Sequence, residues 1–139
     1  MKKSFFMLVI LVSLGVTNSL AQCGGSLTTK YAPTNMGIVI YSNDVETVWN
    51  ALRLANFAME EGDTVSIFLL GKGVELESLV KKNADLKEQT ETFLEKGASI
   101  FGCGTCLSSR KNNAPQICKY SSMKDLYGLI RKSKIVMTF

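Results

Sequence analysis

The sequence predicts an α/β fold in which a single domain is built around a parallel sheet of about five strands with helices on both faces. Two patterns lead to this prediction. Apolar runs of strand length alternate along the chain with segments of helical periodicity. The apolar runs are also continuous, as is typical of parallel strands that are buried on both faces. With 139 residues, 46% of them hydrophobic, the chain is long enough for one core.

The first 21 residues have the pattern of a signal peptide. Lys2 and Lys3 precede an apolar stretch over residues 5–16, and Ser19-Leu20-Ala21 places small residues at the two positions that a signal peptidase reads. The apolar stretch is shorter than the roughly 20 residues that span a bilayer. We therefore expect cleavage before Gln22, no stable membrane span, and an exported, periplasmic protein.

A lipid anchor at Cys23 is a less favoured alternative. Leu20-Ala21-Gln22-Cys23 resembles a bacterial lipoprotein box, but Gln22 is bulkier than the Gly, Ala or Ser that normally precedes the lipidated cysteine. Beyond the cleavage site, residues 22–35 are rich in Gly, Ser and Thr and predict an extended N-terminal segment. Residues 36–139 then form the α/β domain.

The charge balance argues against a nucleic-acid partner. Removal of the signal peptide, which holds two of the 16 basic residues, lowers the formal net charge from +4 to +2. The remaining basic residues form no stripe interleaved with aromatic residues, the pattern that nucleic-acid-binding surfaces carry. We expect no nucleic acid to bind.

The first half of the domain predicts a strand, a helix and a second strand. Residues 37–41 are an apolar run of strand length, and Asn43 follows as the N-cap of a helix, with Glu46 completing a capping box. The apolar residues of this helix follow i, i+3, i+4, i+7 spacing and are Val48, Ala51, Leu52, Ala55, Ala58 and Met59. Gly62 ends the helix, and residues 64–70 form the second strand.

The second half of the domain continues the alternation with shorter helices. Gly71-Lys72-Gly73 closes the second strand as a turn, because it lacks the longer frame of a phosphate-binding loop. Helices are expected over residues 74–81, 86–96 and 123–132, with a further short helix that begins near Cys103 and runs through Arg110. Strands are expected over residues 98–101, 117–120 and 135–137.

One motif offers reactive chemistry, the pair Cys103-Gly104-Thr105-Cys106 directly behind the third predicted strand. The chain has no histidine, which excludes Cys-His catalysis and His-ligated metals. The dipole of a helix favours the reactive thiolate form of a cysteine at its N-terminus. We therefore predict Cys103 and Cys106 as the catalytic residues. Cys103 is the reactive thiol, and Cys106 is either its resolving partner or an inert neighbour.

The surroundings of this pair allow other interpretations. Arg110, about two turns downstream, adds positive potential if the helix brings it back toward the thiols, and the Thr105 hydroxyl is placed to contact a thiolate or persulfide. A simple structural disulfide between Cys103 and Cys106 is the plainest alternative, because the ring that a CxxC motif closes is geometrically easy.

The other two cysteines, Cys23 and Cys118, are expected to be dispensable for thiol chemistry. Four cysteines in an oxidising compartment allow three complete pairings, and a Cys23–Cys118 disulfide that ties down the N-terminus is one option. One CxxC motif with an isolated Cys118 does not provide the ligand set of a structural zinc site. We expect no metal and no cofactor. Asp44 and Glu46 are explained by helix capping.

Several short motifs occur in a fixed order from residue 37 to the C-terminus. They are Tyr41-Ser42-Asn43-Asp44, Ala51-Leu52-Arg53-Leu54-Ala55, Glu61-Gly62-Asp63-Thr64-Val65, Gly71-Lys72-Gly73-Val74 and the segment 97–103. This ordered set resembles the DsrE/DsrF-like family of sulfur-relay proteins, which includes the TusD type. The resemblance implies a DsrE/F-like α/β subunit that assembles as a homotrimer or hexamer. It also implies that Cys103 takes sulfane sulfur from a donor as a persulfide and passes it to an acceptor, the two being proteins or small sulfane-sulfur compounds.

Two features depart from this family and keep three functions open. The relay type is cytoplasmic, whereas this chain carries an export signal. A simple carrier uses one cysteine, whereas here Cys106 would attack a persulfide on Cys103, release sulfide and leave a disulfide. The first function is a sulfur carrier with the character of a sulfurtransferase. The second is a thiol-disulfide redox protein that uses Cys103 and Cys106. The third is a non-catalytic oligomeric binding module with structural disulfides.

Overall fold

The computed structural model describes residues 31–139, so the expected signal peptide, its cleavage site and Cys23 lie outside the described residues. The elements are, in order, β1 (Asn35–Ile40), α1 (Val45–Glu60), β2 (Thr64–Leu69), the 3-10 helix η1 (Gly71–Glu75), α2 (Leu76–Val80), α3 (Ala84–Glu95), β3 (Ser99–Cys103), α4 (Gly104–Ser109), β4 (Lys119–Ser121), α5 (Met123–Lys132) and β5 (Ile135–Thr138). Over residues 31–139, no helix has the length and apolar character needed to cross a membrane.

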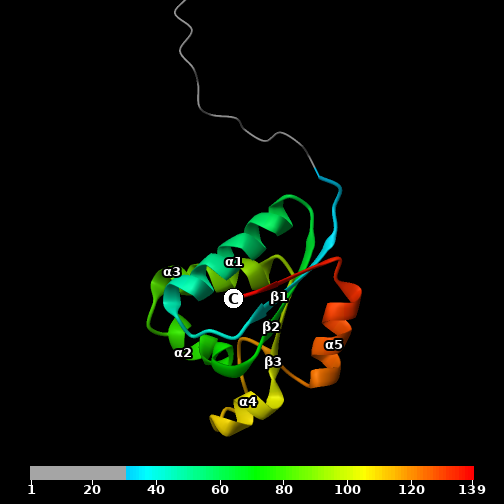
Figure 1. Ribbon diagram of the computed structural model, residues 1–139. Coiled ribbons are helices and arrows are strands. Elements are labelled where there is room, and N and C mark those ends of the chain that lie inside the picture. Colours follow the sequence, from blue (N-terminus) through cyan, green and yellow to red (C-terminus); the bar gives the residue numbers. More distant parts are fainter. Residues whose placement is uncertain (1–30) are drawn as a thin grey trace, which may run out of the picture.

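The strands form one sheet of order β4-β3-β2-β1-β5, in which every pair is parallel. Helices α1, α2 and α3 lie on one side of this sheet and α5 lies on the other (Figure 1). The predicted α/β class, with a parallel five-stranded sheet and helices on both faces, is confirmed. Because the strands are parallel, their carboxyl ends meet at one edge, which we call the carboxyl edge. Both η1 and α4 begin there.

The hydrophobic core lies mainly between the central strands and α1. Strand side chains on this core are fully buried and include Ile38, Ile40, Ile67 and Ile100. The facing residues of α1 are mostly small, with Ala51 and Ala55 fully buried, so the helix lies close to the sheet. Full burial of a large aliphatic or aromatic side chain contributes about 1.5–3 kcal/mol. Val39 and Phe68 point to the other face, which α5 covers, and are buried as well. Burial on both faces explains why the central strands are continuous apolar runs.

The N-terminus of α1 differs from the sequence prediction by one residue. Asp44, not Asn43, is the N-cap, and its carboxylate accepts hydrogen bonds from the Thr47 N–H at 2.8 Å and the Thr47 hydroxyl at 2.7 Å. The predicted capping box with Glu46 is therefore wrong. These hydrogen bonds hold the pKa of the Asp44 carboxyl below its usual value. Asn43 is turned the other way, toward η1, and this contact becomes important at the candidate site.

Smaller boundary differences have local causes. Helix α3 begins two residues before the predicted start because the Asn83 side chain accepts the Leu86 N–H at 2.9 Å. The helix expected over residues 74–81 is divided into η1 and α2. Strand β4 begins two residues later than predicted, at Lys119, which pairs with Phe101. Helix α5 has the predicted bounds. A capping box between Ser122 and Asp125 lies at its N-terminus.

The close contact between η1 and the end of β1 leaves no room for a side chain at Gly73, because a Cβ there would overlap the Ile40 carbonyl. We expect Gly73→Ala to lower the free energy of unfolding by about 1–3 kcal/mol, measured by urea denaturation. Gly128→Ala in α5 is the matched control. A Cβ at Gly128 meets no atom within 4 Å, so alanine should raise stability by about 0.5–1 kcal/mol. Equal effects at the two positions would contradict the packing argument.

Candidate functional site at the carboxyl edge

Cys103 lies where the sequence predicts it, at the junction of a strand and a helix. It is the last residue of β3 and the N-cap of α4. In the sheet it pairs with Ser121 at the end of β4. Its side chain is 5% exposed, so the protein itself surrounds the thiol almost completely. A sulfur atom held there is shielded from bulk solvent.

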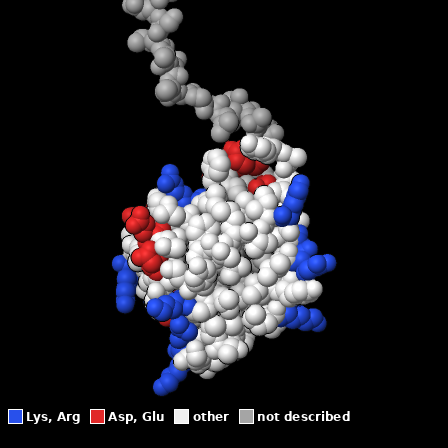
Figure 2. Space-filling model, viewed as in Figure 1, with Lys and Arg blue, Asp and Glu red and all other residues white. Residues whose placement is uncertain are grey.

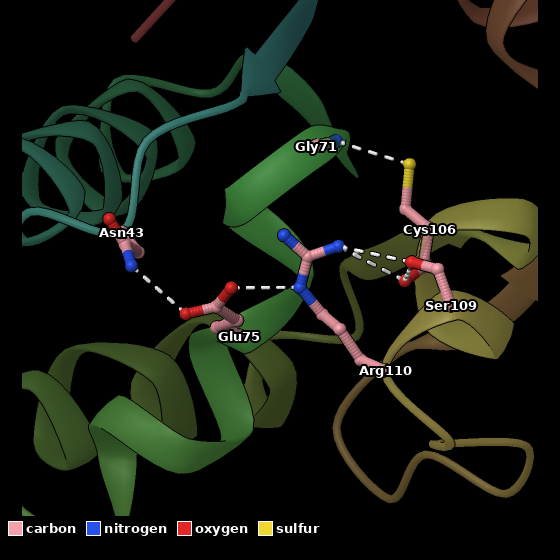
Figure 3. A network of polar contacts seen from close by, with 6 residues as sticks. All are labelled: Asn43, Gly71, Glu75, Cys106, Ser109 and Arg110. Carbon is pink, nitrogen blue, oxygen red and sulfur yellow. Dashed lines mark hydrogen bonds and ion pairs between the residues drawn. The ribbon is translucent and has the colours of Figure 1, made fainter.

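Cys106 lies in the first turn of α4 and is more accessible than Cys103. The backbone N–H of Gly71 donates a hydrogen bond to its sulfur at 3.3 Å (Figure 3). Gly71 is the first residue of η1, just beyond the end of β2, so a neighbouring strand supplies this donor. The contact joins two segments that are 35 residues apart in the sequence.

Arg110 is held beside Cys106 by a second set of contacts. Its guanidinium donates to one Glu75 oxygen at 2.8 Å and to the Cys106 carbonyl at 3.2 Å. The other Glu75 oxygen accepts from the Asn43 amide at 2.9 Å (Figure 3). These contacts lower the pKa of the Glu75 carboxyl, with the Arg110 hydrogen bond as the largest cause. The loop after β1, η1 and the end of α4 are therefore tied together around the thiols.

Opposing influences act on the Cys106 thiol. Burial raises its pKa above the usual value, and a hydrogen bond with the Cys103 thiol raises it further. The Gly71 N–H and the positive charge of Arg110 favour the thiolate and offset part of this increase. Cys106 is consequently protonated at neutral pH. The structure thus places the two predicted cysteines close enough for Cys103 to influence the pKa of Cys106, and it keeps the Cys106 thiolate scarce at neutral pH.

Cys118 is not part of this pair. Its sulfur lies against Gly102, on the face of the sheet opposite to Cys103, because adjacent residues of a strand point to opposite faces. Burial raises the pKa of the Cys118 thiol to about 11, and the charge of Glu77 adds to the increase. Among residues 31–139, no three His, Cys, Asp or Glu side chains are gathered to hold a metal ion. Cys103, Cys106 and Cys118 form no disulfide with one another.

Two residues that the sequence analysis did not single out shape α4. The Tyr120 hydroxyl donates to the Gly104 carbonyl at 3.0 Å and lies 2.7 Å from the Ser108 hydroxyl. A Cβ at Gly104 would overlap the Tyr120 ring, so glycine is required between Cys103 and Thr105. No pattern in the sequence indicates this contact, since it depends on the register between β3 and β4. The Thr105 side chain is exposed.

The charge of Arg110 should be measurable in the reactivity of Cys106. We expect Arg110→Gln to slow alkylation of Cys106 about two- to fivefold near pH 8, because loss of the positive charge disfavours the thiolate. The measurement is iodoacetamide labelling of the reduced protein followed by peptide mass spectrometry. Arg131→Gln, which removes the same charge from α5, should leave the rate unchanged. An equal loss in both variants would contradict a specific role for Arg110.

Comparison with known proteins identifies the family. A family model described as the DsrE/DsrF-like family matches residues 35–139. The chain is 31% identical over 100 residues to Uncharacterized protein MJ0989 of Methanocaldococcus jannaschii, covering 68% of this chain and 88% of that protein. It is 30% identical over 100 residues to Uncharacterized protein MK0008 of Methanopyrus kandleri, covering 68% of this chain and 83% of that one.

Solved structures share the fold at low sequence identity. The ychN protein from E. coli aligns with a TM-score of 0.64 and 17% identity, covering 78% of this chain and 100% of that chain. The conserved protein BT1422 from Bacteroides thetaiotaomicron aligns with a TM-score of 0.62 and 17% identity, covering 76% and 95%. With the match over residues 35–139, these findings confirm the resemblance predicted from the sequence: the chain belongs to the DsrE/DsrF-like family.

Proposed function

We propose that this protein is a sulfur-relay carrier in which Cys103 holds sulfane sulfur as a persulfide. The DsrE/DsrF-like family is associated with sulfur relay. The observation that supports this role most directly is the position of Cys103, whose thiol ends a strand at the carboxyl edge and is 5% exposed. In the proposed step, the Cys103 thiolate attacks the outer sulfur of a sulfane donor. The donor's sulfur–sulfur bond breaks, and its remainder leaves as a thiolate or other sulfur anion.

In this proposal Cys106 discharges the persulfide slowly. Its thiolate attacks the Cys103 sulfur, a disulfide forms between the two cysteines, and the outer sulfur leaves as hydrosulfide. The two cysteines lie near each other at the start of α4, and the raised pKa of Cys106 keeps the attacking thiolate scarce at neutral pH. A persulfide on Cys103 is therefore expected to persist long enough to meet an acceptor.

A thiol-disulfide redox protein is the second candidate function. The nearness of the two thiols favours it, because Cys103 influences the pKa of Cys106 and the two residues are three positions apart at the start of α4. The two functions differ in their product. A redox protein passes electrons and ends as the Cys103–Cys106 disulfide, whereas a carrier passes a sulfur atom and regains both thiols.

We also propose an exported, periplasmic location and a homo-oligomeric assembly, a trimer or hexamer. The location is supported by the signal-peptide pattern of residues 1–21. The assembly is supported by an exposed apolar stripe on one flank of α5, formed by Met123, Tyr127 and Ile130 at i, i+4, i+7 spacing. Donor and acceptor are proposed to be proteins or small sulfane-sulfur compounds that reach the carboxyl edge.

The central test is intact-protein mass spectrometry after incubation of the reduced mature protein with inorganic polysulfide. We expect the mass of one sulfur atom to be gained on Cys103 and to be lost in Cys103→Ser. Cys106→Ser should keep the added sulfur and lengthen its lifetime, because the thiol that discharges it is absent. If the persulfide forms on Cys106 in Cys103→Ser at the wild-type rate, the assignment of Cys103 is wrong. A disulfide that forms without any gain of sulfur would favour the redox function.

Cys118 supplies the control for this test. Its pKa of about 11 keeps the thiol protonated at neutral pH, so we expect Cys118→Ser to load sulfur at the wild-type rate. Labelling of the reduced protein with iodoacetamide should modify Cys118 more slowly at pH 7.5 than at pH 10, because only the thiolate reacts. Loss of sulfur loading in a folded Cys118→Ser protein would contradict the assignment of the site to the Cys103 and Cys106 pair.

A further inference from the structure

A groove on the α5 face of the sheet takes no part in the chemistry proposed for the cysteines. It has a volume of about 500 Å³ and lies between α5 and strands β1, β2 and β3. Met36, Phe101 and Leu129 contribute apolar surface to it, and Lys124 and Lys132 line it from α5. We call it the α5 groove. It is distinct from the apolar stripe of Met123, Tyr127 and Ile130, which follows a different flank of the same helix.

Positive charge surrounds the α5 groove. Lys124 and Lys132 are exposed on α5, and Lys119 places its ammonium 5.7 Å from the centre of the Phe101 ring. Asp125, the acidic residue that lines the groove, is already engaged, because its carboxylate accepts from the Ser122 N–H and hydroxyl. Figure 2 shows basic side chains along the right-hand flank, where Figure 1 places α5, and both acidic and basic ones at the left. The groove therefore suits an acidic ligand.

Gly128, which lines the groove, is a glycine that packing among the described residues does not explain. Glycine within a helix costs about 0.5–1 kcal/mol relative to alanine. Gly37 on β1 is explained by internal packing, since a Cβ there would overlap the Leu129 side chain. Gly128 has no such explanation, because a Cβ there meets no atom within 4 Å. Its missing side chain keeps the wall of the groove open at a cost to helix stability.

We propose that the α5 groove docks an acidic segment of a partner protein. An apolar side chain of that segment packs against Phe101 and Leu129, and flanking carboxylates pair with Lys119, Lys124 and Lys132. The apolar surface of the groove buries an apolar side chain of the segment, and the lysines orient the segment through its carboxylates. A segment in which acidic and apolar residues alternate can make both kinds of contact. Because the lysines are exposed, the attraction is long-range and weakens with salt.

The groove and the reactive thiol lie on the same face of the sheet. Phe101 and Cys103 are two residues apart on β3, so their side chains share a face of the sheet about 6.5 Å apart along the strand. Ser121, the residue paired with Cys103, is followed directly by the N-cap of α5. A partner seated in the groove therefore lies on the face of the sheet to which the Cys103 side chain points, although Cys103 itself does not line the groove. Its identity as sulfur donor or acceptor rests on the proposed function, whereas docking itself does not.

The experiment measures binding of a probe peptide to the mature protein by fluorescence anisotropy. The probe is a short labelled peptide in which glutamate and leucine alternate, and its control has lysine in place of glutamate. We expect the glutamate peptide to bind at least about tenfold more tightly and to weaken as salt rises. Equal binding of the two peptides would overturn the proposal.

Variants locate the binding. The double variant Lys124→Glu, Lys132→Glu should weaken binding at least about tenfold, whereas Lys82→Glu, Lys87→Glu, with the same change of charge next to and within α3, should not. Gly128→Leu should fill the groove and abolish binding, while Gly128→Ala should reduce it far less. If the groove variants instead split an oligomer in sedimentation velocity and leave peptide binding unchanged, a second copy of the chain occupies this face and the proposal is wrong.

One further measurement separates this inference from the proposed function. Gly128→Leu should still gain sulfur on Cys103 from inorganic polysulfide at the wild-type rate, because a small donor does not need the groove. Loss of peptide binding with intact sulfur loading supports docking in the groove. Intact peptide binding in Gly128→Leu overturns the docking proposal, whether or not Cys103 carries a persulfide.

Discussion

The parallel register of β3 between β2 and β4 is the constraint on which the candidate site depends. Gly102 is paired with Leu69 on one side and with Tyr120 on the other. This register brings Gly71, two residues beyond Leu69, within hydrogen-bonding distance of Cys106, and it lays the Tyr120 ring against Gly104. A slip of one residue would turn Cys103 to the other face of the sheet. The chemistry of the thiols is thus decided by backbone pairing.

Burial places the two cysteines of the motif in different environments. Cys103 is surrounded by protein, so a sulfur atom bound to it is sheltered, and access is limited to molecules that fit the carboxyl edge. Cys106 is nearer to solvent, yet its pKa is raised by burial and by Cys103 itself. Arg110 opposes that increase, and Glu75 and Asn43 hold Arg110 in position. The balance between burial, Cys103 and Arg110 determines how much of the Cys106 thiol is present as thiolate.

Features that depend on local residue patterns can be predicted from the sequence, whereas features that depend on contacts between distant residues cannot. The strands, α5 and the position of Cys103 depend on local apolar patterns, and the sequence predicts them. Asp44 caps α1 instead of Asn43 because its carboxylate accepts the hydrogen bond from the Thr47 N–H, and either of these adjacent residues could supply such an acceptor. The contacts of Arg110 with Glu75 and of Gly71 with Cys106 join residues 35 positions apart, and no periodicity encodes them. The open space beside Gly128 can be recognised only in the structure, where α5 packs over the sheet.

The position of β5 in the sheet has a consequence for how the protein folds. β5 is paired with the first strand, Met36 opposite Ile135, and Phe139 completes the pairing by donating to Val39 and accepting from Tyr41. The sheet therefore pairs the two strands that are most distant in the sequence. Such non-local pairing slows folding and leaves the edge of β1 uncovered until β5 arrives. Until β5 pairs, β1 is a bare strand edge. After pairing, β5 takes its place as the edge strand, with Ile135, Val136 and Met137 exposed on it.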